Sequence, residues 1–130
     1  MKSVVVCTSK RFKNEVAEFC GELEKKGVMV FEPNFEEVVG EEDFIQSHHL
    51  TKVVFKGLTL EHFNWITKAE VCYVYNKEDY CGVSVAMEMA YATALKKPIF
   101  ALSSRTGDPC RDALIDKVVP TVDELVRLLG

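Results

Sequence analysis

The sequence predicts an α/β protein: a flavodoxin-like or Rossmann-like three-layer sandwich on a five-stranded parallel sheet. Short β-branched runs alternate along the chain with segments whose apolar residues recur at helical spacing. Strands that alternate with helices form a parallel sheet that is covered on both faces through right-handed crossovers. The 130 residues, 48% of them hydrophobic, can bury one core, so we expect one domain over residues 1–130.

The first unit is a strand at residues 3–8 (SVVVCT) followed by a helix at residues 14–26, which carries an apolar stripe. Gly27 is placed to end this helix, and residues 28–32 (VMVFE) form the second expected strand, which closes at Pro33.

Residues 34–57 have no single periodicity, and we expect mostly loop with a short helix. Thr59 then resembles a helix N-cap, with an apolar stripe that continues to Ala69. The third strand is expected at residues 71–75 (VCYVY).

The last third of the chain repeats the strand and helix rhythm. We expect a helix at residues 85–96, strands at 98–102 and 117–119, and a final helix at 122–129 after Thr121. The default order for five such strands is 2-1-3-4-5, with a ligand site at the switch point between strands one and three. The loops at residues 7–12 and 76–82 lie there.

Composition excludes several classes of function. Sixteen basic and twenty acidic residues give a net charge of -4 without a basic run, which argues against a nucleic-acid polymer as partner. No stretch approaches the length that crosses a bilayer, so we expect no membrane partner. Five cysteines without a C-x-x-C pair, and an N-terminal apolar run too short for a signal peptide, indicate the reducing cytoplasm. The adjacent His48 and His49 lack ligand spacing, so we expect a solvated loop and no metal site.

The stretch GVSVAMEMAYATALKKPIF begins at the expected ligand site. Gly82 and Ser84 precede the helix, whose first amides suit a phosphate or a carboxylate; the alternative is that Ser84 only caps the helix. Glu88 lies one turn later on an otherwise apolar face, about 6 Å along the axis, so a sugar 5-phosphate could span the two positions. Its carboxylate could then attack the anomeric carbon, or it could simply point to water.

Three further candidates remain open. His62 could reach the same cleft as an acid, a base or a sugar-hydroxyl partner, or it could be a surface residue. The first loop offers Thr8, Ser9 and Arg11 to a ligand, or it is a solvated turn. Cys81 could be the nucleophile of a thiol enzyme, but no motif spacing supports it over a core or loop role.

The runs HFNWITKAEVCYVYN and YCGVSVAMEMAYATALKKPIF resemble the nucleoside 2-deoxyribosyltransferase superfamily, which includes the deoxynucleoside 5-monophosphate N-glycosidases. The resemblance implies that Glu88 is the nucleophile, that Ser84 stands at the family's helix-start glycine, and that residues 7–9 border the sugar. The resemblance and the two loops at the switch point together lead us to expect substrate contacts from Cys7, Thr8, Ser9, Arg11, Asn76, Gly82 and Ser84.

Two departures from the family pattern bear on the mechanism, whereas a third, Glu70 in place of the usual Asp before the third strand, is interpreted as structural. His62 stands where characterised members carry an Asp beside the nucleophile, and Gly82 where they carry an acid or a phosphate-binding serine. The expectation is therefore cleavage or exchange of an N-glycosidic bond in a nucleoside or nucleoside 5-monophosphate, with Glu88 and His62 as catalytic residues. The alternative is a non-catalytic nucleotide-binding or sensing module. The resemblance also implies a homo-oligomer and neither metal nor organic cofactor.

Overall fold

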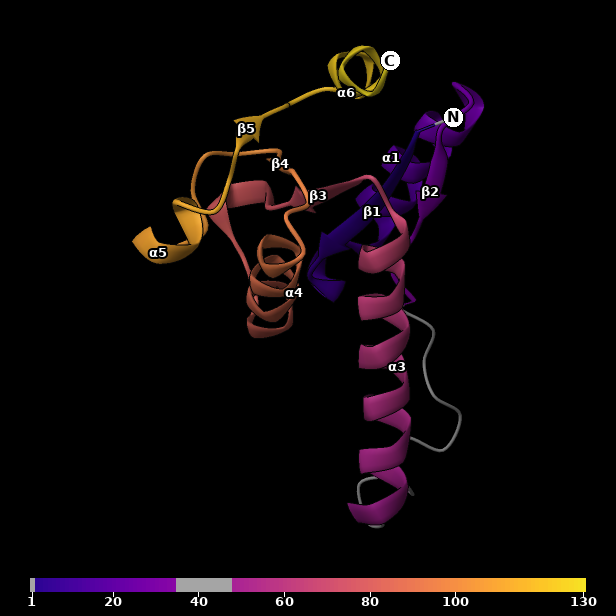
Figure 1. Ribbon diagram of the computed structural model, residues 1–130, viewed down its shortest axis with the longest axis vertical. Helices are drawn as coiled ribbons and strands as arrows, with labels where there is room; N and C mark the ends of the chain where they lie inside the picture. The colour runs from indigo at the N-terminus through magenta and orange to yellow at the C-terminus, as the bar shows by residue number, and fades with distance from the viewer. Residues whose placement is uncertain (1, 35–47) are drawn as a thin grey trace.

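The computed structural model describes residues 2–34 and 48–130. Five strands in these ranges form a parallel sheet of order β2-β1-β3-β4-β5 (Figure 1). The strands are β1 (Ser3–Thr8), β2 (Met29–Phe31), β3 (Val71–Tyr75), β4 (Ile99–Ala101) and β5 (Lys117–Val118). This sheet confirms the predicted fold class and strand order. β1 and β3 form the central pair, from Val4 opposite Val71 to Thr8 opposite Tyr75.

Helices cover both faces of the sheet. α1 (Lys13–Lys25) packs on α6 (Val122–Leu129), and α3 (His48–Lys68) packs on α4 (Val83–Ala94). The shorter elements are α5 (Pro109–Asp112) and the 3-10 turns η1 (Lys10–Phe12) and η2 (Lys77–Asp79). This arrangement gives three layers, helix, sheet and helix.

β1 is buried along its whole length, as expected of a central parallel strand. Its side chains alternate between two cores: Val4 belongs to the core beneath α1 and α6, whereas Val5 and Cys7 belong to the core beneath α4 and the end of α3. The alternation therefore places Cys7 on the α3 and α4 side, where the candidate site lies.

Two predicted helix starts are wrong. α3 begins at His48, and Thr59 lies inside it, where its hydroxyl donates to the Phe55 carbonyl at 2.7 Å. The β-branched residues and Gly57 in the N-terminal part of α3 lower its helix propensity. For this reason the sequence did not predict that the helix begins before Thr59. His48 and His49 thus belong to the first turn of α3, with His49 exposed, rather than to a loop. Of the predicted loop, residues 35–47 lie outside the described residues.

α4 begins at Val83 with Gly82 as the N-cap, so Ser84 is the second residue of the helix and not its cap. The sequence correctly predicted the residue that ends α1 and the residue that caps the start of α6. Gly27 adopts a φ of 84° after α1, which suits glycine, and the Thr121 side chain accepts from the Glu124 amide to cap α6. α5, which was not predicted, is capped by Asp108.

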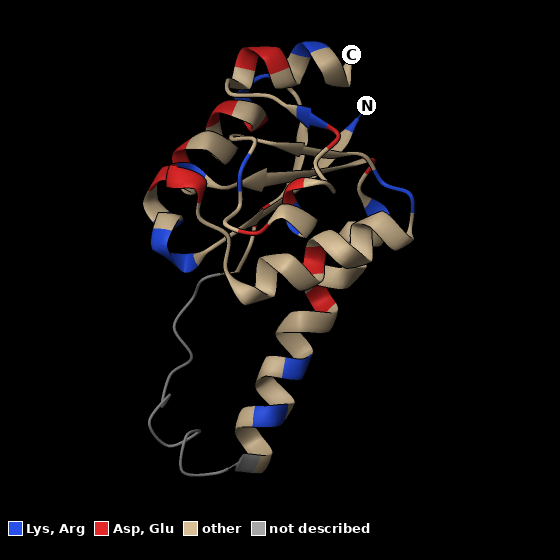
Figure 2. Cartoon of the chain, turned by 90° about the vertical axis from the view of Figure 1, so that its left-hand side faces the viewer, with Lys and Arg blue, Asp and Glu red and all other residues tan. Residues whose placement is uncertain are grey.

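The N-terminal part of α3 extends beyond the sheet, and the only charged residues along this part are lysines (Figures 1 and 2). Several of its apolar side chains are at least half exposed: Leu50, Val53, Phe55 and Leu60. Among residues 2–34 and 48–130, no helix combines the length and apolarity that crossing a membrane requires.

A tyrosine hydroxyl ties β3 to the segment after β5, and its removal tests the core. Tyr73 is fully buried, and its hydroxyl donates to the Val119 carbonyl at 2.7 Å. We expect Tyr73→Phe to lower the free energy of unfolding by about 1–2 kcal/mol, because a buried carbonyl loses its donor. Tyr91→Phe is the control, since the Tyr91 hydroxyl lies 3.4 Å from Thr67 in an exposed pair. Urea denaturation measures both, and equal effects would contradict the assignment.

Candidate functional site

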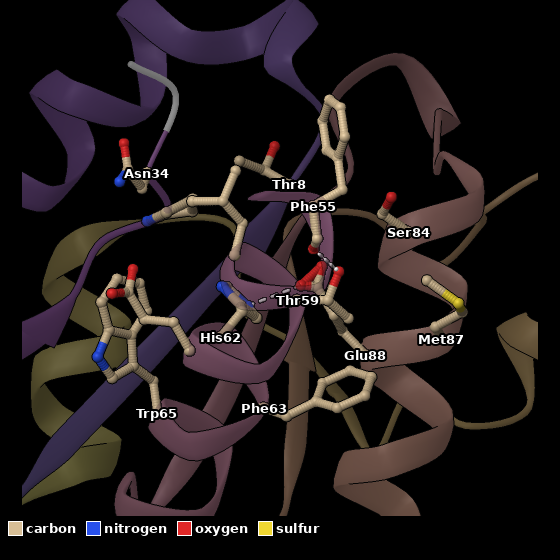
Figure 3. A pocket seen from close by; sticks show the side chains of 13 residues that line it. Thr8, Asn34, Phe55, Thr59, His62, Phe63, Trp65, Ser84, Met87 and Glu88 are labelled. Carbon is tan, nitrogen blue, oxygen red and sulfur yellow. Dashed lines mark hydrogen bonds and ion pairs between the residues drawn. The ribbon is translucent and has the colours of Figure 1, made fainter. Parts of the chain in front are cut away.

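A cavity of about 200 Å³ lies between α3 and α4, at the carboxyl ends of β1 and β2 (Figure 3). Thr8 at the end of β1 and Asn34 after β2 form one side, and Ser84 and Glu88 on α4 form another. Pro33 and Met87 also line the cavity, and α3 supplies most of the remaining lining: Phe55, Leu58, Thr59, Glu61, His62, Phe63 and Trp65. The cavity is thus at the edge of the sheet where the strand order predicts a ligand.

Glu88 and His62 form a close pair in the wall of this cavity. His62 Nε2 lies 2.7 Å from Glu88 Oε2, and the two side chains are 13% and 11% exposed. A carboxylate among apolar neighbours is stable when it is hydrogen-bonded and paired, and His62 supplies that partner. Figure 3 shows the two side chains meeting across the gap between α3 and α4.

Cys7 lies behind this pair, at the end of β1. Its Sγ is 3.3 Å from His62 Nε2 and 3.4 Å from Cys72 Sγ. The hydrogen bond with Cys72, burial, and the nearby Glu88 raise the pKa of the Cys7 thiol well above its usual value. The neutral thiol is therefore the form present near pH 7, which argues against Cys7 as a nucleophile.

The surroundings of Cys81 do not support its role as the nucleophile of a thiol enzyme. Cys81 is buried, and desolvation raises its pKa, although Arg111 opposes this effect. It is not among the described residues that line the cavity.

The start of α4 brings a second predicted residue to the cavity. Ser84 lines it and is exposed, while Gly82 has no side chain with which to cap the helix. The backbone N–H groups of the first turn are therefore without a side-chain cap, which is the arrangement that anions use at helix N-termini.

Asn76 requires a correction, because its side chain is fully buried and bonded to the chain itself. Its amide donates to the carbonyls of Ser103, at 2.9 Å, and Arg105, at 2.6 Å, and its oxygen accepts from the Ser103 amide at 2.9 Å. These bonds join the end of β3 to the loop after β4 and leave little capacity for a substrate. Asn76 positions the loop instead.

Ser9, Arg11 and Gly82 are not among the described residues that line the cavity. Ser9 accepts from the Arg11 amide and caps η1, and the Arg11 guanidinium lies 3.7 Å from the centre of the Tyr80 ring. Of the predicted site residues, Thr8, His62, Ser84 and Glu88 thus line the cavity, and Ser9, Arg11 and Gly82 do not.

Sequence reasoning missed most of the lining from α3. Phe55, Leu58, Thr59, His62 and Trp65 follow the spacing of one helical face. That signal was present, but the helix was predicted to begin at Thr59, which cut the face in two. Cys7 was predicted to contact the sugar of the substrate. In the structure its Sγ lies 3.3 Å from His62 Nε2.

Three residues at this site, Cys7, His62 and Glu88, are of the types that bind transition metals. One ligand atom each from Cys7, His62 and Glu88 lies within 4.8 Å of the others. Sequence reasoning did not find this cluster, because the three residues are far apart in the chain and come from β1, α3 and α4.

The fold resembles that of solved structures to which the sequence has little similarity. The chain matches no protein-family model, and no curated protein is significantly similar in sequence. A solved 2-deoxyribosyltransferase from Bacillus psychrosaccharolyticus is 18% identical, with a TM-score of 0.62 over 95% of this chain and 90% of that one. A conserved protein from Enterococcus faecalis V583 is 13% identical, with a TM-score of 0.61 over 98% of this chain and 96% of that one. At these identities the likeness concerns the fold.

Replacement of Asn76 tests its structural role. We expect Asn76→Ala to lower the free energy of unfolding by about 2–4 kcal/mol, because buried backbone groups lose their partners. The matched control is Asn64→Ala at an exposed position on α3, which we expect to change stability by less than about 0.5 kcal/mol. Thermal and urea unfolding measure both. An Asn76→Ala protein of unchanged stability would contradict this assignment.

Proposed function

We propose that the chain binds a nucleoside or a nucleoside 5-monophosphate in this cavity and cleaves or exchanges its N-glycosidic bond through Glu88. The observation that carries the proposal is the His62 and Glu88 pair, at 2.7 Å, in the wall of a cavity at the carboxyl ends of parallel strands. The fold likeness to a 2-deoxyribosyltransferase supports the same class of reaction.

The proposed chemistry begins with attack of a Glu88 oxygen on the anomeric carbon. The bond from this carbon to the base nitrogen breaks, and its electron pair leaves with the base, which takes up a proton from solvent. The resulting ester between the sugar and Glu88 is then attacked at the same carbon by water or by a second base, which frees the carboxylate. Water gives hydrolysis, and a second base gives transfer.

His62 has two tasks in this scheme. Its contact with Glu88 orients the carboxylate, because Nε2 lies 2.7 Å from Oε2 on the α3 side. Once Glu88 is esterified, the imidazole is the neighbouring group that can take the proton of an attacking water. In this role His62 replaces the carboxylate that the resemblance places beside the nucleophile.

The start of α4 is the proposed site for the 5-hydroxyl or 5-phosphate of the sugar. Ser84 is one turn before Glu88, so a pentose can extend from the first-turn amides to the carboxylate. Thr8 lies at the end of β1 on the same cavity, with its hydroxyl donating to the Tyr75 carbonyl at 2.9 Å, and can accept a hydrogen bond from the sugar.

We also infer a homo-oligomer in a reducing, cytoplasmic setting. Phe55 and Met87 line the cavity and are about half exposed, and Val53 on α3 is exposed as well. A second copy packed on this apolar part of α3 would cover these side chains and narrow the cavity. All five cysteines are free thiols, which suits a reducing compartment.

Base release tests the proposed activity. Purified protein is incubated with nucleosides and deoxynucleoside monophosphates, with and without a second base, and free base is measured by chromatography. We expect Glu88→Gln to reduce release by about 1000-fold or more while nucleotides still raise the melting temperature, because the variant keeps the shape of the site but lacks the nucleophile.

Glu18→Gln, at an exposed position on α1, is the control for loss of one carboxylate. Release that persists in Glu88→Gln would refute the proposed nucleophile. Absence of release from the unaltered protein, with nucleotides still raising its melting temperature, would favour the non-catalytic binding module.

The oligomer is tested by adding a charge to α3. We expect Val53→Glu to lower the mass measured by light scattering toward that of a monomer, because a carboxylate would be buried in the contact. Val118→Glu introduces the same charge on the edge strand β5 and is expected to leave the mass unchanged. A monomeric unaltered protein would overturn the inference.

A further inference from the structure

We propose that Cys7, His62 and Glu88 form a binding site for one Zn²⁺ ion. The ligand atoms would be Cys7 Sγ, His62 Nε2 and a Glu88 carboxylate oxygen, which lie within 4.8 Å of one another in the buried wall of the cavity. This proposal is independent of the catalytic role of Glu88. It also runs against the expectation of no metal that the sequence supports.

Two of the three distances between the ligand atoms can be compared with those of a tetrahedral zinc site, and the third is at most 4.8 Å. With bonds of about 2.3 Å to sulfur and 2.0–2.2 Å to nitrogen and oxygen, neighbouring ligands lie about 3.3–3.6 Å apart. Cys7 Sγ and His62 Nε2 are already 3.3 Å apart. His62 Nε2 and Glu88 Oε2 are 2.7 Å apart, so the metal would have to widen this contact by about 0.6 Å.

The donor set selects the metal. One sulfur, one imidazole nitrogen and one carboxylate oxygen are ligands typical of Zn²⁺, whereas Mg²⁺ and Ca²⁺ prefer oxygen alone. A Cys7 thiolate and a Glu88 carboxylate would neutralise the two charges of the ion, which reduces the cost of its burial. Zinc binding releases the Cys7 thiol proton to solvent, together with any proton that His62 and Glu88 share.

The surroundings complete the coordination. Cys72 Sγ lies 3.4 Å from Cys7 Sγ and can donate a hydrogen bond to the thiolate from the protein side. The fourth position of the metal would face the cavity, where Thr8 and Ser84 lie and where water or a ligand oxygen can enter. Three protein ligands with one open position are the pattern of accessible zinc sites rather than of closed structural ones.

Zinc would also oppose the proposed reaction, a consequence that rests on the proposed function. The carboxylate that holds the metal is the one that would attack the anomeric carbon, so the metal-bound protein is inactive. If base release is observed, Zn²⁺ should abolish it and a chelator should restore it. The binding itself is measured without substrate.

Cobalt titration tests the site on the reduced, chelator-treated protein. We expect one equivalent of Co²⁺ to produce a sulfur-to-metal charge-transfer band in the near ultraviolet and intense visible bands of a four-coordinate ion. One equivalent of Zn²⁺ should remove both. Glu88→Gln and His62→Asn should weaken Co²⁺ binding by at least about 10-fold, and Cys7→Ser should remove the charge-transfer band.

Cys110→Ser is the matched control, because Cys110 is the exposed cysteine of the five. Cys7 is fully buried, so circular dichroism verifies the fold of its variant, and Glu88→Gln at the cavity wall provides an independent test if that variant does not fold. Three results would overturn the proposal: no saturable Co²⁺ uptake at micromolar concentrations, a spectrum that Glu88→Gln leaves unchanged, or a charge-transfer band lost in Cys110→Ser.

Discussion

The contact between His62 and Glu88 is the interaction on which the candidate site depends. A carboxylate that is 9% exposed between two helices needs a polar partner, and His62 is positioned to supply it only because α3 packs directly on α4. That packing follows from the strand order. From β2 to β3 and from β3 to β4 the chain moves in the same direction across the sheet, so crossovers of the usual right hand place α3 and α4 on one face. The central pairing of β1 with β3 then brings Cys7 beneath the two side chains.

The fold was predictable because its signals are local. The run SVVVCT and the Thr121 cap each identify an element from neighbouring residues alone. Glu88 and Ser84 were predictable as site candidates because the end of a parallel strand and the start of the next helix meet at a known edge of the sheet. The length of α3 was not, because Thr59 has the residue type of a cap while its hydroxyl in fact bonds back to Phe55 within the helix.

Contacts between distant parts of the chain were beyond sequence reasoning. Nothing near Cys7 in the sequence indicates that its sulfur lies 3.3 Å from the His62 ring, since the two residues are 55 positions apart. For Asn76, the sequence predicted a contact with the substrate, whereas the side chain is bonded to the protein itself. A polar residue in a loop at the ligand edge of the sheet is a reasonable candidate for binding, but its amide is used by the backbone of Ser103 and Arg105.

The proposed activity and the proposed metal site use the same atoms in different states. His62 Nε2 and Glu88 Oε2 lie 2.7 Å apart in the free protein, a sugar would contact the carboxylate from the cavity, and zinc would draw the side chains of Cys7, His62 and Glu88 toward one centre. The two proposals therefore predict competition, while each can fail without the other. Base release does not require metal uptake, and metal uptake does not require turnover.

The central claim is that Glu88 bonds to the sugar, and intact-mass spectrometry tests it directly. The protein is quenched with acid during reaction with the nucleoside or nucleotide that releases base, and the adduct is mapped by peptide digestion. We expect a mass increase of one glycosyl unit, carried by the peptide that contains Glu88 and absent in Glu88→Gln. An adduct on another residue would contradict it.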